Sequence, residues 1–314
     1  MKLLILTGKF GMGHWSASCS LKQQLEADHG VEAQVVDFFA AALPELSPTL
    51  YKGFNFLVTY GGGLYNLVHR LTANSAAPQF DPVADGLAEK LAGLLEETRP
   101  DAVVATHPVC AQLMSRFKRT YGSTLPLATC ITDVTCHSEW INPGTDCYFV
   151  GSPTVRDGLA AKGVDPRRIV ITGIPVREEF KQPVRRGGGL PRNLLIMGGG
   201  LGLMPRRESF YEALNALPSV HTTIITGRND QLSPPLAAHS PPLPVLPFTP
   251  PLYDYISPSP LLLPPPPRLP LFAPLFSPLP LLPFPPSLPP PPAHPPFLPP
   301  PRLCLVPPPP PPLS

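Results

Sequence analysis

Short apolar runs alternate with segments of helical periodicity along the first 180 residues of the chain. The six runs lie at residues 2–8, 33–39, 101–108, 126–132, 147–152 and 169–176. Unbroken apolar runs are typical of strands that are covered on both faces, and the helical segments between them allow parallel pairing. The pattern therefore predicts an α/β fold with a doubly wound parallel sheet, in which ligands bind at the carboxyl ends of the strands.

The same pattern starts again after a break in composition. Residues 177–192 are charged, rich in glycine and interrupted by proline, which is typical of a linker between domains. A strand–helix–strand pattern then follows over residues 193–227. We expect residues 1–176 to form one Rossmann-like domain and residues 193–232 to begin a second one.

The proline content changes abruptly near Ser233. Residues 1–232 hold 15 of the 51 prolines, and residues 233–314 hold the other 36. Proline has no backbone N–H and a fixed φ, so central strands and helix interiors do not accommodate it at this density. We predict that residues 233–314 are disordered or badly packed and that the second sheet is incomplete and cannot form in the usual way.

Charge and cysteine content exclude several classes of function. The net charge is +2 and the basic run at 116–119 is short, so we predict no nucleic-acid partner. The six cysteines form no C-x-x-C pair, so we expect free thiols in a reducing cytosol and no metal site. We also expect no signal peptide, and no apolar stretch approaches the ~20 residues that cross a bilayer.

A glycine-rich turn after the first strand contains the first candidate for catalysis. The segment "GKFGMGH" places Gly11 and Gly13 before His14, but it fits neither the dinucleotide fingerprint nor the P-loop. A strand–glycine–helix junction exposes backbone N–H groups, and the positive end of a helix disfavours imidazolium. His14 is therefore either a general base or a residue that caps the helix, and the turn alone favours the cap.

Residues 47–71 allow two interpretations. The segment is rich in aromatic residues and contains three consecutive glycines at 61–63. It is either a pair of core helices broken at the glycines or an amphipathic element that contacts a membrane or a lipid.

Five segments, in order along residues 1–232, resemble the monogalactosyldiacylglycerol synthase family, which includes the processive diacylglycerol glucosyltransferases of bacteria. They are "GMGHWSAS", "ITDVTCHSEWINPGTDCYFVGS", "ITGIPVREEF", "LLIMGGGLGL" and "IITGRNDQL". The resemblance implies a GT-B architecture of two Rossmann-like domains. It also implies transfer of a hexose from a UDP-sugar to a diacylglycerol-type lipid, with inversion and without a metal or another cofactor.

The resemblance assigns roles to individual residues. His14 matches the family histidine proposed as the base for the acceptor hydroxyl, and Asp133 would orient a base or cap a turn. The acceptor or its lipid would be bound by Gly11, Gly13, His137 and Trp140, with core packing an equal alternative for Trp140. The donor would be bound by Gly198, Gly199, Gly200, Gly202, Gly227 and Asn229. We assign a structural role to His107.

The proline-rich tail keeps the apolar spacing of the family's donor-binding half but not its polar residues. The family's lysine and two glycines correspond here to Pro265, Pro267 and Arg268. The resemblance therefore predicts a hexosyltransferase. We expect the chain with the present sequence to be inactive. The alternative is a non-catalytic module that binds lipid or membrane and has a disordered tail. The resemblance places the protein at the cytoplasmic face of a membrane, as a peripheral protein.

Overall fold

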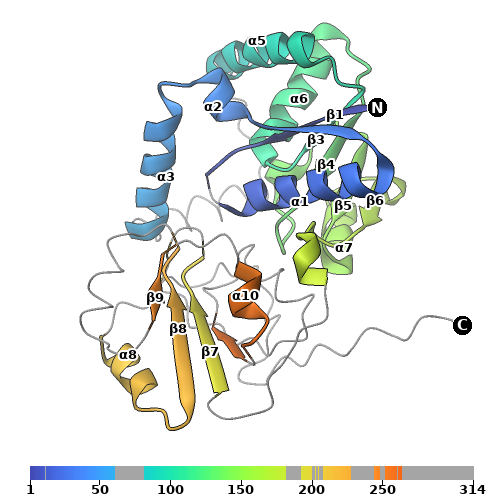
Figure 1. Cartoon of the computed structure of the whole chain (residues 1–314). Helices are drawn as coiled ribbons and strands as arrows, with labels where there is room; N and C mark the ends of the chain where they lie inside the picture. Colours follow the sequence, from blue (N-terminus) through green and yellow to red (C-terminus); the bar gives the residue numbers. More distant parts are fainter. Residues whose placement is uncertain are drawn as a thin grey trace, which may run out of the picture. The chain divides into compact units, whose positions relative to one another are not determined.

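A computed structural model divides the chain into two compact units, Met1–Glu178 and Glu179–Ser314. The structure describes residues 1–10, 12–60, 81–181, 192–199, 202, 204, 208–227, 244–247, 252–259 and 261–263. Each unit is built on a parallel sheet of its own (Figure 1). None of the described helices is both long enough and apolar enough to cross a membrane.

The first unit contains a six-stranded sheet in the order β2-β1-β3-β4-β5-β6. Its strands are β1 (Lys2–Thr7), β2 (Glu32–Asp37), β3 (Ala102–Ala105), β4 (Leu127–Cys130), β5 (Cys147–Val150) and β6 (Ile169–Ile171). Every neighbouring pair is parallel. The six strands predicted from the apolar runs are therefore confirmed, and so is the α/β class of the fold.

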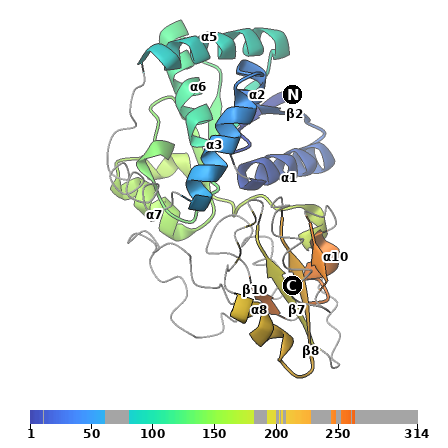
Figure 2. The same cartoon turned by 90° about the vertical axis from the view of Figure 1, so that its left-hand side faces the viewer.

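Helices cover both faces of this sheet, which explains why its strands are apolar without alternation. The helices are α1 (Met12–His29), α2 (Phe38–Ala42), α3 (Ser47–Tyr60), α5 (Asp81–Thr98), α6 (Pro108–Tyr121) and α7 (Pro153–Ala161). Leu4 and Leu6 of β1 pack in one core with α5 and α6, whereas Leu3 and Ile5 pack in another with α1. Figures 1 and 2 show α1 apart from α5 and α6.

One boundary differs from the sequence-based prediction. The run 33–39 was expected to be strand throughout, but β2 ends at Asp37 and α2 begins at Phe38. The Asp37 carboxylate accepts a hydrogen bond from the Ala40 N–H at 3.3 Å, which caps the new helix. Phe38 and Phe39 are buried by this helical turn rather than by the strand.

The second unit contains a four-stranded parallel sheet in the order β10-β7-β8-β9. Its elements are β7 (Arg192–Met197), α8 (Glu208–Asn215), β8 (Val220–Ile225), β9 (Val245–Leu246), α10 (Leu252–Ile256) and β10 (Leu261–Leu263). Leu195 and Met197 pack with Phe180 and Ile256 on one side of the sheet. Leu194 and Ile196 pack with the α8 side of the unit.

The proline-rich tail contributes two short strands, β9 and β10, to this sheet. β9 lies between Pro244 and Pro247, and β10 lies between Pro260 and Pro264. Both are outer strands of the sheet, where proline at a strand end removes no central hydrogen bond. α10 begins directly after Pro251, and a helix start tolerates proline because the N–H there has no helical partner.

Candidate functional site

The candidate site lies where the strand order of the first sheet reverses. The chain passes from β1 to β2 on one side, while β3 lies on the other side of β1. In doubly wound sheets, ligands bind in the crevice at the carboxyl ends of the two strands that flank such a reversal. The residues that follow β1 and β3, His14 on α1 and the pair Thr106–His107, therefore meet at this point.

His14 is the third residue of α1, and its ring is fixed by hydrogen bonds. Its Nδ1 atom lies 2.8 Å from the carbonyl oxygen of Thr106 and 2.8 Å from Thr132 Oγ1. Ser18 supports the arrangement from the next turn of α1, because its hydroxyl donates to the His14 carbonyl at 2.8 Å. The Ser18 hydroxyl also lies 2.7 Å from Thr106 Oγ1.

These contacts select one tautomer of His14. A carbonyl oxygen can only accept, so the short contact with Thr106 requires that Nδ1 carries the proton. In the neutral ring the lone pair then lies on Nε2, which is the atom that can accept a proton. The contacts with Thr106 and Thr132 therefore fix the orientation of the His14 ring.

Aromatic rings enclose the same place. The His107 ring lies 4.9 Å from the His14 ring, centroid to centroid, and the fully buried Trp140 ring lies 6.0 Å from it. Phe10 contacts His107 at 5.4 Å and also the rings of Tyr51 and Phe54 on α3, at 4.9 and 5.4 Å. The start of α3 is thus joined through aromatic contacts to the His14 site.

The segment between β4 and β5 contains three of the predicted site residues, and two of them are buried. Acceptor contact and core packing were equal alternatives for Trp140, and its side chain is completely buried in an apolar core. Its Nε1–H donates to Asp133 Oδ2 at 2.7 Å, so Asp133 is held by Trp140. His137 is also buried and accepts a hydrogen bond from the Glu139 N–H at 3.3 Å, at the start of the short helix η1 (Ser138–Trp140).

Glu139 is the titratable group with the most unusual environment in this segment. Its Oε1 lies 3.5 Å from Nδ1 of His137. Burial raises the pKa of Glu139 to about 7, and the negative charge of Asp133 contributes in the same direction. Sequence reasoning missed Glu139, because its raised pKa depends on burial by the fold and on the proximity of Asp133.

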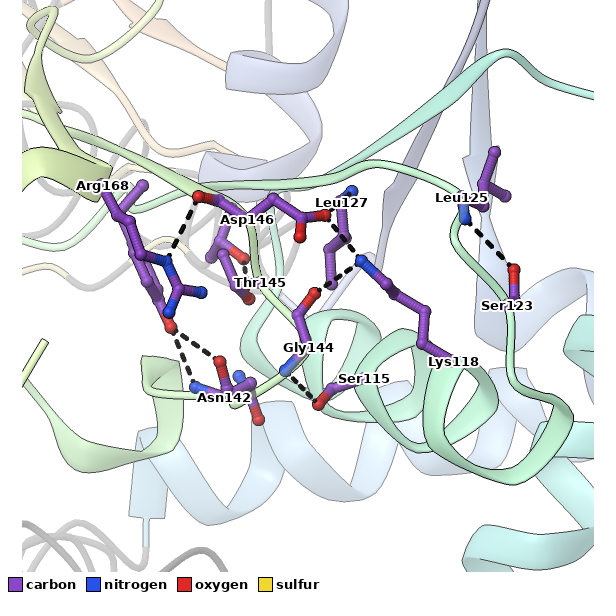
Figure 3. A network of polar contacts seen from close by, with 12 residues as sticks. Ser115, Lys118, Ser123, Leu125, Leu127, Asn142, Gly144, Thr145, Asp146 and Arg168 are labelled. Atoms are coloured by element: carbon purple, nitrogen blue, oxygen red, sulfur yellow. Dashed lines mark hydrogen bonds and ion pairs between the residues drawn. The ribbon is translucent and has the colours of Figure 1, made fainter. Parts of the chain in front are cut away.

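A polar network fixes the far end of the segment that carries Asp133 and Trp140 (Figure 3). The Lys118 ammonium on α6 donates to Asp146 Oδ2 at 2.6 Å and to the Gly144 carbonyl at 3.0 Å. The Leu127 N–H, at the start of β4, donates to the same Asp146 oxygen at 2.7 Å. The segment is therefore anchored at the amino ends of β4 and β5, opposite the His14 site.

The predicted donor residues gather at the carboxyl ends of β7 and β8. The Gly198 N–H donates to the Ile225 carbonyl at 2.8 Å, and the Gly202 N–H donates to the Gly199 carbonyl at 3.3 Å. Gly227 has φ +70°, and a Cβ there would lie 2.0 Å from the Gly199 carbonyl oxygen, so only glycine fits. The two glycine turns thus pack backbone against backbone. Gly11, Gly200 and Asn229 lie outside the described residues.

The sequence singled out His14 but not the groups that orient it. Thr106 and Thr132 follow β3 and β4, at the sheet edge where ligand-binding groups were expected. Their position after two strands could have identified them as neighbours of His14. The sequence does not show which strands lie beside β1, so this contact could not be predicted. Among the described residues, no group of three His, Cys, Asp or Glu side chains is arranged to hold a metal ion.

Comparisons with known proteins agree with this architecture. A processive diacylglycerol beta-glucosyltransferase of Bacillus cytotoxicus is 28% identical over 244 residues, which cover 74% of this chain and 61% of that protein. A probable chloroplastic monogalactosyldiacylglycerol synthase of Nicotiana tabacum is 28% identical over 255 residues, which cover 74% of this chain and 47% of that protein. The chain thus matches about half to three fifths of the length of these relatives.

Solved structures show the same fold. MurG of Acinetobacter baumannii superposes with a TM-score of 0.57 at 16% identity, over 90% of this chain and 78% of MurG. A glycotransferase of kitacinnamycin gives a TM-score of 0.56 at 18% identity, over 92% and 82% of the two chains. The fold is therefore GT-B-like, with two Rossmann-like units. The family model of monogalactosyldiacylglycerol (MGDG) synthase matches residues 14–176, which include His14, Thr106 and Thr132, and the chain belongs to this family.

Proposed function

We propose that this protein belongs to the hexosyltransferases that move a sugar from a UDP-hexose to a diacylglycerol-type lipid. The observation that carries the proposal is the Nδ1–H of His14 held by the Thr106 carbonyl at 2.8 Å. It leaves the lone pair on Nε2, as a base for an alcohol requires. The relatives named above are described as enzymes that act on diacylglycerol or make its galactolipid, which supports the same acceptor class.

The reaction follows from the position of this base. His14 Nε2 takes the proton of the lipid hydroxyl while the oxygen attacks the anomeric carbon of the sugar. The bond from that carbon to the diphosphate breaks, and UDP leaves with the electron pair. A single displacement of this kind inverts the anomeric carbon. Proton removal by a positioned base typically contributes ~10²–10⁴ in rate.

The donor would be bound by the glycine turns of the second unit. The glycine turns lie at the carboxyl ends of β7 and β8, where parallel sheets bind ligands, and glycine lets a diphosphate approach the backbone closely. Gly198, Gly199, Gly202 and Gly227 would contact the diphosphate, with Gly200 and Asn229 assigned to the same set. The resemblance to the family implies a transfer without a metal. Since prolines replace polar residues of the donor half, we expect weak or no transfer by this chain as it stands.

The acceptor side would operate at a membrane surface. Leu46, Leu50 and Phe56, on α3 or directly before it, are 59%, 43% and 66% exposed. Apolar side chains on an amphipathic helix favour the boundary of a bilayer. The aromatic contacts from α3 to Phe10 and His107 connect such a surface with the His14 site. We therefore expect a peripheral membrane protein, and the resemblance to the family implies the cytoplasmic face.

The test is a transfer assay with diacylglycerol vesicles and labelled UDP-glucose or UDP-galactose. It uses both the chain as it stands and a version with the glycines and lysine of the family restored in the tail. We expect glycolipid from the restored version and a loss of about 10²–10⁴-fold in His14→Ala. His221→Ala, at an exposed position of β8, is the matched control and should keep full activity. Equal activity in both variants would remove the base assignment.

A second function is supported by the same exposed residues of α3. A module that binds lipid or membrane without catalysis needs the first unit and the apolar surface, but no donor site. In that case the chain binds diacylglycerol vesicles with unchanged affinity in His14→Ala and does not bind UDP. Measured UDP binding therefore separates the two functions.

A further inference from the structure

His107 lies beside His14 but has no part in the reaction described above. It stands between β3 and α6 with extended backbone angles, φ −126° and ψ 135°, at the N-cap position of α6. N-cap side chains commonly accept a hydrogen bond from the first helical turn, but the His107 side chain makes no such bond. Its ring instead meets the His14 ring edge-on, at 4.9 Å and an interplanar angle of 69°.

Burial of the His107 imidazole at this position is energetically unfavourable. Only 8% of His107 is exposed, and its Nδ1 is buried with no hydrogen-bond partner in the described part of the chain. Such an unpaired buried atom destabilises the folded protein. The rings of Phe10 and Phe39 surround it at 5.4 and 5.6 Å, so a phenylalanine would suit these neighbours without the cost. A bound ligand that forms a hydrogen bond with this ring explains why a histidine, rather than a phenylalanine, occupies the position.

The charge state of His107 restricts the ligand. Burial, together with the positive charge that His14 can carry, holds the pKa of His107 well below its ordinary value. The ring is therefore neutral at physiological pH, with one N–H donor and one acceptor nitrogen. A neutral imidazole suits an uncharged oxygen better than a phosphate, which prefers cationic partners.

We propose that His107 binds a second oxygen of the acceptor, next to the hydroxyl that His14 deprotonates. The inference rests on the proposed function. Two imidazoles with ring centroids 4.9 Å apart can bind two oxygens carried by neighbouring carbons. The acceptor is then an alcohol with a second oxygen on the adjacent carbon. In a glyceride this oxygen belongs to an ester, and in a sugar to a second hydroxyl. His107 selects the acceptor, while proton transfer remains with His14.

The test compares acceptor binding to the full chain and to His107→Phe by titration calorimetry. The probes are 1,2-dioctanoylglycerol, octyl glucoside and 2-octyl-1-dodecanol, which has two alkyl chains and one hydroxyl but no neighbouring oxygen. We expect His107→Phe to weaken binding of the preferred oxygen-bearing probe about 10- to 100-fold, the equivalent of losing a paired buried group. Binding of 2-octyl-1-dodecanol should not change. The probe that loses affinity identifies the second oxygen as glyceride or sugar.

A second variant separates recognition from packing. His107→Gln keeps a donor and an acceptor but not the ring, and should retain part of the discrimination between dioctanoylglycerol and the monoalcohol. The same fall for all probes in His107→Phe, or no fall for any, would overturn the inference. If the unchanged chain binds none of the probes, the proposed acceptor fails as well. If it binds dioctanoylglycerol and both variants bind it equally, only the role of His107 fails.

Discussion

Glu139 makes the stability of the first unit depend on pH near neutrality. Burial raises its pKa from 4.5 to about 7, and Asp133 adds to the shift. Between these two pH values the folded state binds the proton more often than the unfolded state does. The free energy of unfolding therefore falls as the pH rises through this window. Because 36% of the side chain is exposed, water screens part of the effect.

Glu139→Gln cannot ionise and should remove this dependence. We expect the variant and the natural chain to be equally stable near pH 4.5, with the variant the more stable of the two at pH 8. Urea unfolding at several pH values measures the difference. Glu97→Gln, at an exposed position of α5, is the control and should show no difference that grows with pH. A constant gap between Glu139→Gln and the natural chain would contradict the assignment.

The loop from β4 to β5 links the site to a distant anchor. Burial raises the pKa of Asp146, but the hydrogen bonds from Lys118 and from the Leu127 N–H outweigh it and lower the pKa below its ordinary value. The stabilisation is therefore present at neutral pH and lost as the pH falls through the folded-state pKa. The ion pair is partly exposed, so its contribution is about 1 kcal/mol.

Asp146→Asn should lower the free energy of unfolding by about 1 kcal/mol at pH 7 and by less at acidic pH. Urea denaturation checks it. Asp157→Asn is the control, because Asp157 pairs with its exposed neighbour Arg156 and fixes no backbone. Equal effects of the two substitutions would show that the network does not stabilise the loop.

The predictable elements are those whose patterns are local. Continuous apolar runs identified the six strands of the first sheet because helices cover both of its faces. Phe38 and Phe39 were placed in a strand because the cap formed by Asp37 depends on a backbone turn that apolar content does not show. Thr106 and Thr132 were missed, and His107 was assigned only a structural role, for a different reason. Their contacts with His14 join residues 92 or more positions apart, and the order of the strands decides them.

The two units are expected to respond differently to the donor's nucleotide. Each has its own sheet with apolar cores on both faces, so we expect residues 1–178 to fold alone. If the glycine turns of β7 and β8 bind UDP, the nucleotide should raise the unfolding temperature of the full chain and not that of the 1–178 fragment. Calorimetric melts with and without UDP measure both.

Gly227→Ala should abolish the response of the full chain to UDP. Its Cβ would lie 2.0 Å from the Gly199 carbonyl, and φ +70° disfavours any L side chain, so the two turns must separate. Gly93→Ala is the matched control, because that helical position of α5 has open space around it and alanine favours helix by about 1 kcal/mol. It should keep the response to UDP. If the natural chain does not respond to UDP at all, the donor site is absent and the lipid-binding module becomes the better description, because that function requires only the first unit.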